Sequence, residues 1–76
     1  MMMNKYVVEG WLSKSMAIVK EFDSADKANK YAEDMANKYL GKSFNVLGPN
    51  DISGLTDCHW QYSKDFDKAV RFIHND

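Results

Sequence analysis

Residues 24–40, SADKANKYAEDMANKYL, carry the strongest secondary-structure signal in the chain. Apolar residues recur there at steps of three and four, which gathers them into one stripe along a helix. The stripe comprises Ala25, Ala28, Tyr31, Ala32, Met35, Ala36, Tyr39 and Leu40. Asp23 or Ser24 can cap the first turn, and Gly41 follows where a left-handed residue often ends a helix. The pattern predicts an amphipathic helix whose stripe must be covered by other apolar elements.

The segments around this helix predict β-strands. KYVVEGWL at 5–12 and MAIVKEF at 16–22 are short and rich in β-branched and aromatic residues. The SKS between them is typical of a turn, so the two segments form a predicted hairpin. KSFNVLG at 42–48 and the segment 57–62 predict a third and a fourth strand.

The end of the chain predicts a second helix, which Ser63 or Asp65 can cap. Four apolar residues fall at helical spacing in it: Phe66, Ala69, Val70 and Ile73. The element order is then ββαββα, which favours an α+β fold with a four-stranded antiparallel sheet and both helices packed on one face. With 76 residues, the chain is long enough for a single domain over 1–76 and no more.

The segment TDCHWQYSKDFD, 56–67, contains the only cysteine and one of the two histidines. In a strand, Cys58 and His59 point to opposite faces, which keeps the thiol away from the nearest base. Cys58, Trp60 and Tyr62 share a face and are expected to pack against a helix. The cysteine, histidines and acids match no tight metal-ligand spacing. We therefore predict no catalytic residue, no metal site and no cofactor.

Composition narrows the functional classes. Ten basic residues nearly balance eleven acidic ones, and Arg71 is the only arginine. This composition argues against binding to the phosphate backbone of nucleic acids. One cysteine excludes an internal disulfide and suits a reducing compartment. No apolar run approaches the roughly 20 residues of a membrane span. The N-terminus MMMNKYVV lacks the features of a signal peptide. We expect a cytoplasmic protein.

One face of the predicted sheet is left without an explanation. If the helices cover the face with Tyr6, Val8, Leu12, Ile18 and Phe22, the other face carries Val7, Glu9, Trp11, Ala17, Val19 and Glu21. Tryptophan is enriched at binding hot spots, and a contiguous exposed apolar patch marks an interaction site. The predicted partner-binding residues are Val7, Glu9, Trp11, Val19 and Glu21. The reversed assignment of faces would bury Trp11, and Lys20 on the covered face keeps that alternative open.

Residues 5–48, with YVVEGWL, MAIVKEF, a capped alanine-rich helix and SFNVLG, resemble the ββαβ layout of very small phage-encoded inhibitors. These include inhibitors of host RNA polymerase and anti-CRISPR proteins. GWLSKSM, with the KE at 20–21, is similar to the N-terminal region of Dmd-like phage antitoxins. The resemblance implies a phage protein for host takeover or anti-defence, which binds and blocks a host or defence-system protein. It does not extend to residues 49–76 and brings no site residue with it.

Two other functional classes compete with the non-enzymatic interaction protein. A small nucleic-acid-binding module would contact phosphates through Lys5, Lys14, Lys20 and Lys42 and would stack bases on Tyr6 or Trp60. The near-neutral charge ranks this alternative second. An enzyme ranks third, because general acid–base catalysis needs a cleft and so short a chain leaves little room for one.

Overall fold

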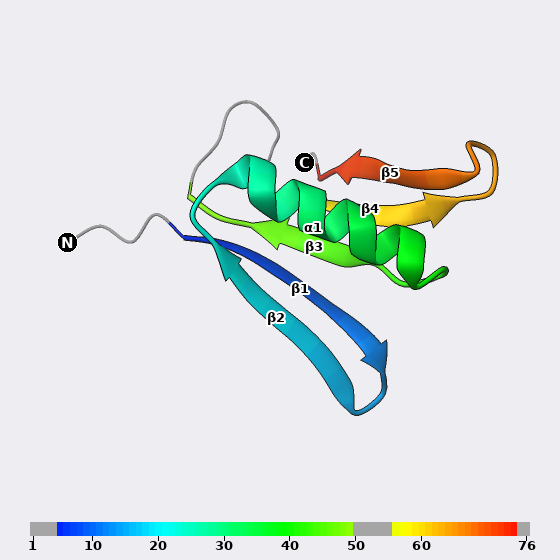
Figure 1. The fold of residues 1–76 in the computed structure, drawn as a ribbon, viewed down its shortest axis with the longest axis horizontal. Helices are drawn as coiled ribbons and strands as arrows, with labels where there is room; N and C mark the ends of the chain where they lie inside the picture. The colour runs from blue at the N-terminus through cyan, green and yellow to red at the C-terminus, as the bar shows by residue number, and fades with distance from the viewer. Residues whose placement is uncertain (1–4, 50–55, 75–76) are drawn as a thin grey trace.

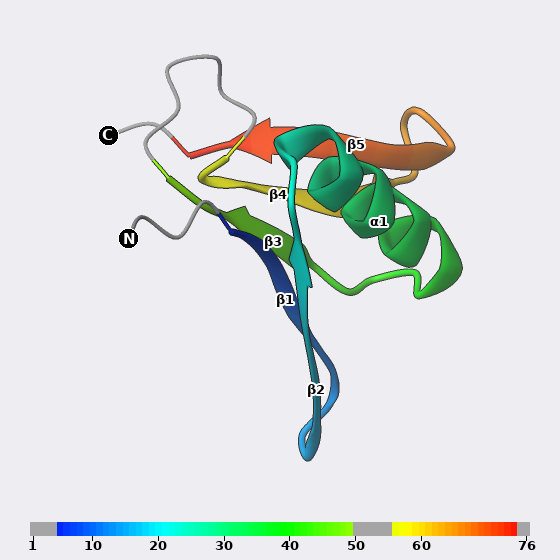
Figure 2. The same cartoon turned by 60° about the vertical axis from the view of Figure 1, so that its left-hand side comes forward.

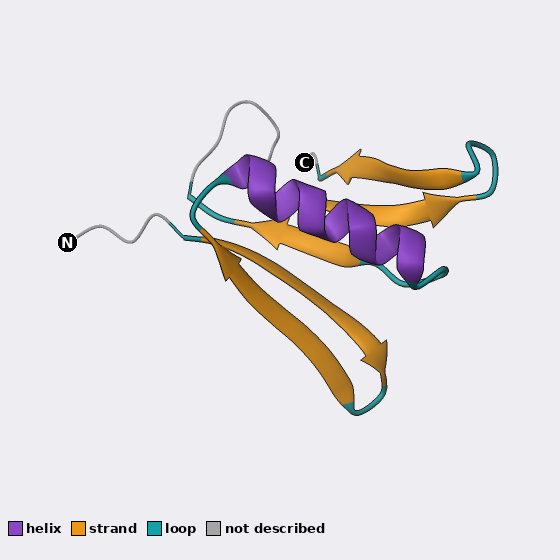
Figure 3. Cartoon of the chain, in the orientation of Figure 1, coloured by secondary structure: helices purple, strands orange, loops and turns teal. Residues whose placement is uncertain are grey.

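A computed structural model of the chain describes residues 5–49 and 56–74. The elements in this part of the chain are β1 (Tyr6–Ser13), β2 (Met16–Phe22), α1 (Ala25–Lys38), β3 (Phe44–Leu47), β4 (Cys58–Ser63) and β5 (Lys68–Ile73). The strands form one sheet in the order β2-β1-β3-β4-β5, and every neighbouring pair is antiparallel. The helix lies across one face of this sheet (Figures 1 and 3). The predicted α+β fold with an antiparallel sheet is therefore confirmed.

The predicted helix over 24–40 corresponds to α1, which ends at Lys38, two residues earlier than expected. Ser24 caps it, because its Oγ accepts a hydrogen bond of 3.2 Å from the amide of Lys27. Gly41 has a φ of 85°, the left-handed conformation expected after a helix end. Leu40 lies beyond the last turn and is exposed rather than part of the stripe.

The second predicted helix is wrong, and so is the four-stranded sheet. Ser63 is the last residue of β4, residues 64–67 form a turn, and the chain returns as β5. Phe66, expected on the inner side of a helix, is 66 % exposed in that turn. Asp65, a predicted helix cap, is a turn residue, as is Asp67. A fifth strand satisfies the free hydrogen-bonding edge of β4, which a helix there would have left open.

The core lies between α1 and the middle of the sheet. It consists of Val8, Ala28, Ala32, Ala36, Phe44, Val46, Cys58 and Ala69. The small alanine side chains let the helix lie close to the strands, and the predicted stripe is confirmed at these three helical positions. Gly10 serves the same purpose on β1, because a Cβ there would come within 2.7 Å of the Phe44 ring.

A buried polar residue joins the helix to the sheet. The Asn29 Oδ1 accepts a hydrogen bond of 2.8 Å from Trp60 Nε1 and lies 3.6 Å from Cys58 Sγ, while its Nδ2 donates to the Ala25 carbonyl. Cys58 and Trp60 therefore face the helix, as expected from the alternation of β4. These contacts also fix which face of the sheet is covered.

The β1–β2 hairpin extends away from the helix and from the rest of the sheet (Figure 2). Its geometry explains how Lys20 can lie on the helix side of β2. The lysine is exposed, and its Nζ lies 5.4 Å from the centroid of the Tyr31 ring, so the charge stays hydrated while it contacts an aromatic face.

Candidate interaction surface

Side chains on the face opposite α1 are exposed over much of the sheet. Val8 is completely buried under the helix, whereas Trp11 is 62 % and Val19 is 67 % exposed. The register pairs Trp11 with Ala17 and Glu9 with Val19, so these four side chains share one side of the hairpin. The alternative in which Trp11 belongs to the core is therefore wrong. We call the side of the sheet opposite α1 the open face.

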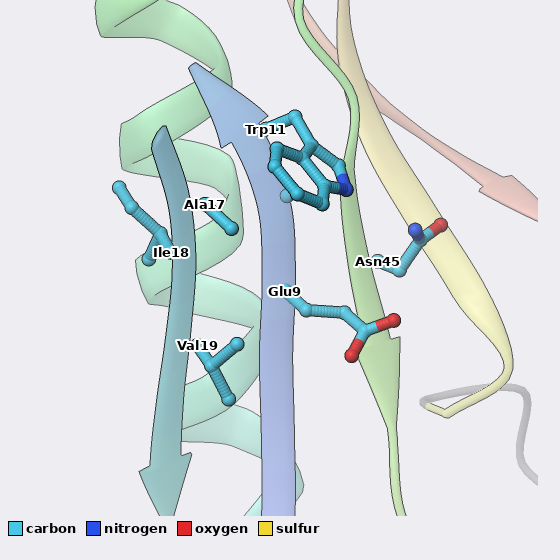
Figure 4. Close-up of a pocket in the computed structure, with 7 residues that line it drawn as sticks. Glu9, Trp11, Ala17, Ile18, Val19 and Asn45 are labelled. Carbon is cyan, nitrogen blue, oxygen red and sulfur yellow. The ribbon is translucent and has the colours of Figure 1, made fainter. Parts of the chain in front are cut away.

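The five residues predicted as a partner site lie together on the open face. They are Val7, Glu9, Trp11, Val19 and Glu21, and we call them the tryptophan patch. Glu9, Trp11, Ala17, Val19 and Asn45 help to line a shallow pocket of about 240 Å³. Figure 4 shows the Trp11 indole and the Glu9 carboxylate on the same side of the ribbon, with Glu9 reaching toward β3.

The open face continues beyond the tryptophan patch across all five strands. The registers place Val19, Glu9, Asn45, His59 and Phe72 in one row from β2 to β5. Leu47 and Phe72 add further exposed apolar area. The sequence prediction missed the part on β5 because that segment was assigned to a helix. The alternation within KAVRFI, with Val70 and Phe72 on one face, was the signal that could have found it.

Two histidines form a pair at the far end of the open face. His59 Nδ1 and His74 Nε2 are 2.7 Å apart, and the His59 ring stacks on Phe72 with centroids 5.0 Å apart. The His74 amide also donates to the carbonyl of Asp57, which continues the β4–β5 pairing. Burial, and secondly the charge of His74, lower the pKa of His59 below 6.5. Since one ring nitrogen must accept the shared hydrogen bond, at least one ring of the pair is neutral.

The thiol of Cys58 lies on the opposite side of the sheet from this histidine pair. Cys58 is completely buried on the helix side of β4, next to Asn29, and His59 is on the other side. The predicted separation of thiol and imidazole is therefore confirmed. Within residues 5–49 and 56–74, no group of three or more histidine, cysteine or acidic side chains could hold a metal ion.

The residues proposed for nucleic-acid contact do not converge on one surface. Lys14 lies in the β1–β2 turn, whereas Lys5 precedes the opposite end of β1. Trp60 packs against the core and donates its indole N–H to Asn29, so its prediction as a stacking surface is wrong. Tyr6 is also half-buried against the core. Lys5 and Lys14 therefore do not form a common phosphate-binding surface with Trp60.

The outer side of α1 is a solvated face of mixed charge. Lys30 and Asp34 form the expected ion pair at 3.2 Å, and Lys27 pairs with Asp23 at the same distance. Both pairs are highly exposed, so they contribute little to stability. Two of its lysines are paired with carboxylates and its charge is mixed, so this face is a weaker candidate for partner recognition than the open face.

No protein-family model, curated protein or solved structure matches the chain. The described helix is too short and too polar to cross a membrane. The functional interpretation therefore depends on the chemistry of the open face.

Proposed function

We propose that this protein is a small non-enzymatic interaction protein that binds another protein through the tryptophan patch. The observation that supports the proposal is the exposure of Trp11 next to Val19, on a sheet face that the helix does not cover. Large exposed apolar side chains on a folded domain favour association, and tryptophan contributes a large rigid contact area.

The charges of the patch favour a partner of defined chemistry. Glu9 and Glu21 are exposed on either side of Val19, and none of the five patch residues is basic. Their carboxylates would steer the protein toward a basic surface with apolar pockets. A host or defence-system protein with such a surface is the proposed partner. Its function would be blocked when the patch covers it, as in the phage-encoded inhibitors that the sequence resembles. The proposed site of action is the cytoplasm.

Affinity capture with two matched variants tests this proposal. Tagged wild-type protein, Trp11→Asp and Phe66→Asp are each incubated with nuclease-treated bacterial lysate, and the retained proteins are identified. Phe66 is a suitable control because it is 66 % exposed in the β4–β5 turn, away from the patch. Circular dichroism first establishes that all three proteins are folded. The retained protein is then purified and its affinity for each variant is measured by calorimetry.

The proposal predicts one stoichiometric protein that binds the wild type and Phe66→Asp but not Trp11→Asp. Binding should weaken with added salt, because the acids contribute to encounter. A partner that binds Trp11→Asp as tightly as wild type would overturn the proposal, as would the absence of any patch-dependent protein. Retention of nucleic acid in untreated lysate, lost on nuclease treatment, would instead favour the nucleic-acid-binding module.

A further inference from the structure

The ionisable side chains on the open face are separated by sign. Glu9 and Glu21 lie on β1 and β2, whereas His59 lies on β4 and Lys68 on β5. His74 follows β5 directly and contacts His59. The strand between the two groups is β3, which contributes the neutral Asn45. Within the strands, the open face is therefore acidic on β1 and β2 and carries a lysine and a histidine on β4 and β5, while Lys5 and Asp57, which precede β1 and β4, do not follow this separation.

This separation makes the open face complementary to itself. A twofold axis in the interface and parallel to β3 places β1 of one copy over β4 of the other, and β2 over β5. The registers then bring three pairs of side chains opposite each other: Glu9 with His59, Glu21 with His74, and Val19 with Phe72. Asn45 lies on the axis and meets its own copy.

We propose that the open face binds a second copy of this chain, in a symmetric dimer whose twofold axis runs along β3. Two sheets would pack face to face, an arrangement in which strand directions stay within about 30°. The apolar pairs Val19–Phe72 and Ala17–Val70 would be buried, and Trp11 would cover Gln61. Each acid–histidine contact occurs twice, because the interface is isologous.

The charges also favour this axis over the other one that aligns the strands of the two sheets, which is perpendicular to the strands and runs through the row from Val19 to Phe72. A twofold axis perpendicular to the strands would place β1 over β1 and would bring Glu9 close to its own copy. Like charges opposed in an interface strongly disfavour association. The parallel axis replaces these contacts by pairs in which a carboxylate accepts a hydrogen bond from an imidazole.

The histidine pair can donate to both opposing carboxylates once the pair carries one added proton. His59 is faced by His74 and Phe72 from the β5 side and by Asn45 from β3, and the Asp57 carbonyl holds the His74 amide. In the neutral pair, the shared hydrogen bond uses one of the two N–H groups, so only one ring can donate to a carboxylate, whereas the singly protonated pair keeps one free N–H on each ring. The opposing carboxylates favour protonation, so the dimer should tighten as the pH falls from about 8 to about 6.

The dimer does not depend on the proposed function. A partner protein would compete with the second copy for the open face, and either association can exist without the other. The dimer is tested with purified protein alone, so a failure of one proposal leaves the other to its own experiment.

A charge exchange gives the sharpest test. Sedimentation equilibrium over a range of concentrations is measured for wild type, Glu9→Lys, His59→Glu and an equimolar mixture of these two variants. Each variant alone should dimerise about 10- to 100-fold more weakly than wild type, because two contacts become repulsive or lose their attraction. The mixture should form a heterodimer, because the ammonium group introduced at position 9 of one chain then opposes the carboxylate introduced at position 59 of the other. A wild type that stays monomeric, or a mixture that gains no affinity over the separate variants, would overturn the dimer.

A cross-link at the axis gives a test that does not depend on charge or on the folding of His59→Glu. Asn45→Cys should be joined into a covalent dimer by a short bismaleimide, since the two residues meet on the axis. Lys30→Cys is the control, because Lys30 is exposed on the outer side of α1 and its copies would lie on opposite surfaces of the dimer. The native Cys58 is buried, so wild type should not react. Equal cross-linking of Asn45→Cys and Lys30→Cys would overturn the proposed interface.

Discussion

The side-chain amide of Asn29 holds α1 against β4 through hydrogen bonds on both of its ends. Replacement by alanine removes the acceptor of the Trp60 indole N–H, which then has no partner in a water-poor site. We expect Asn29→Ala to lower the free energy of unfolding by about 1–3 kcal/mol, the range for a buried donor left unsatisfied. Urea denaturation followed by circular dichroism measures this change.

Asn37→Ala is the matched control for this substitution. Asn37 is exposed, and its Oδ1 accepts a single hydrogen bond of 2.7 Å from the Ala69 amide. Its loss should lower the free energy of unfolding by about 1 kcal/mol, because only this one hydrogen bond is removed. If Asn29→Ala is no more destabilising than Asn37→Ala, the Asn29 amide does not anchor the helix.

The lowered pKa of His59 predicts a loss of stability in mild acid. The folded protein holds the ring neutral, whereas in the unfolded chain the ring binds a proton around the ordinary pKa of 6.5. Acidification below that value therefore favours the unfolded state, and the loss is complete below the folded-state pKa. We expect the urea midpoint of dilute protein to fall between about pH 7.5 and about pH 5.5. The fall should be smaller in His59→Gln. An equal fall in both proteins would assign the pH dependence to other groups.

At the residue scale, sequence patterns predicted which face of β4 each side chain occupies, but not the residues that it contacts. The alternation of β4 correctly placed Cys58 and Trp60 toward the helix. The hydrogen bond from Trp60 to Asn29 joins residues that are 31 positions apart, and no local pattern predicts such a pairing. The contact between His59 and His74 was missed because it depends on β5 as a strand.

Among the elements, α1 was predictable because three signals agree: its cap, its stripe and the glycine after it. The segment 66–73 is compatible with two hydrophobic periods, that of a helix and that of a strand. Phe66, Ala69, Val70 and Ile73 fit a helix, but Lys68–Ile73 also alternates and is rich in β-branched and aromatic residues. The free edge of β4 decided between them, since pairing there satisfies a row of backbone groups. That edge exists only after the sheet has been assembled.

The β4–β5 turn gives a prediction at the scale of one hairpin. Asp67 has a left-handed φ of 56°, and its carboxylate accepts a hydrogen bond from the Tyr62 hydroxyl. Asp67→Gly loses this hydrogen bond, but glycine adopts the positive φ without strain. Asp67→Ala loses the same hydrogen bond and also places alanine in the strained left-handed conformation. We expect Asp67→Ala to be less stable than Asp67→Gly by about 1 kcal/mol in urea denaturation. In both variants the pKa of Tyr62, which the Asp67 hydrogen bond raises, should return toward 10.0. Equal stabilities would show that the turn relaxes away from the positive φ.

At the scale of the whole molecule, α1 covers only one face of the sheet, and the face that it leaves uncovered is the proposed binding surface. One helix covers the middle of five strands, and it leaves the open face and the β1–β2 hairpin outside the core (Figure 2). Alternation within two strands placed Trp11 on the same face as Glu9 and Val19, but it left open which face the helix covers. The full extent of the open face required the strand order, which places sequence-distant β5 in the same sheet.

This unequal coverage predicts a gradient of hydrogen exchange across the sheet. β3 lies between β1 and β4 and contributes the completely buried Phe44 and Val46, whereas the turn around Lys14 lies at the tip of the hairpin. Local opening requires the least free energy where few apolar contacts are broken. In dilute protein, we expect amides in β3 to exchange about 100-fold or more slowly than those near the hairpin tip. At high concentration, the slower exchange of the tip relative to dilute protein would reflect coverage by a second copy. Uniform protection across β1, β2 and β3 in dilute protein would contradict the gradient, because it would require the hairpin to open only with the whole domain.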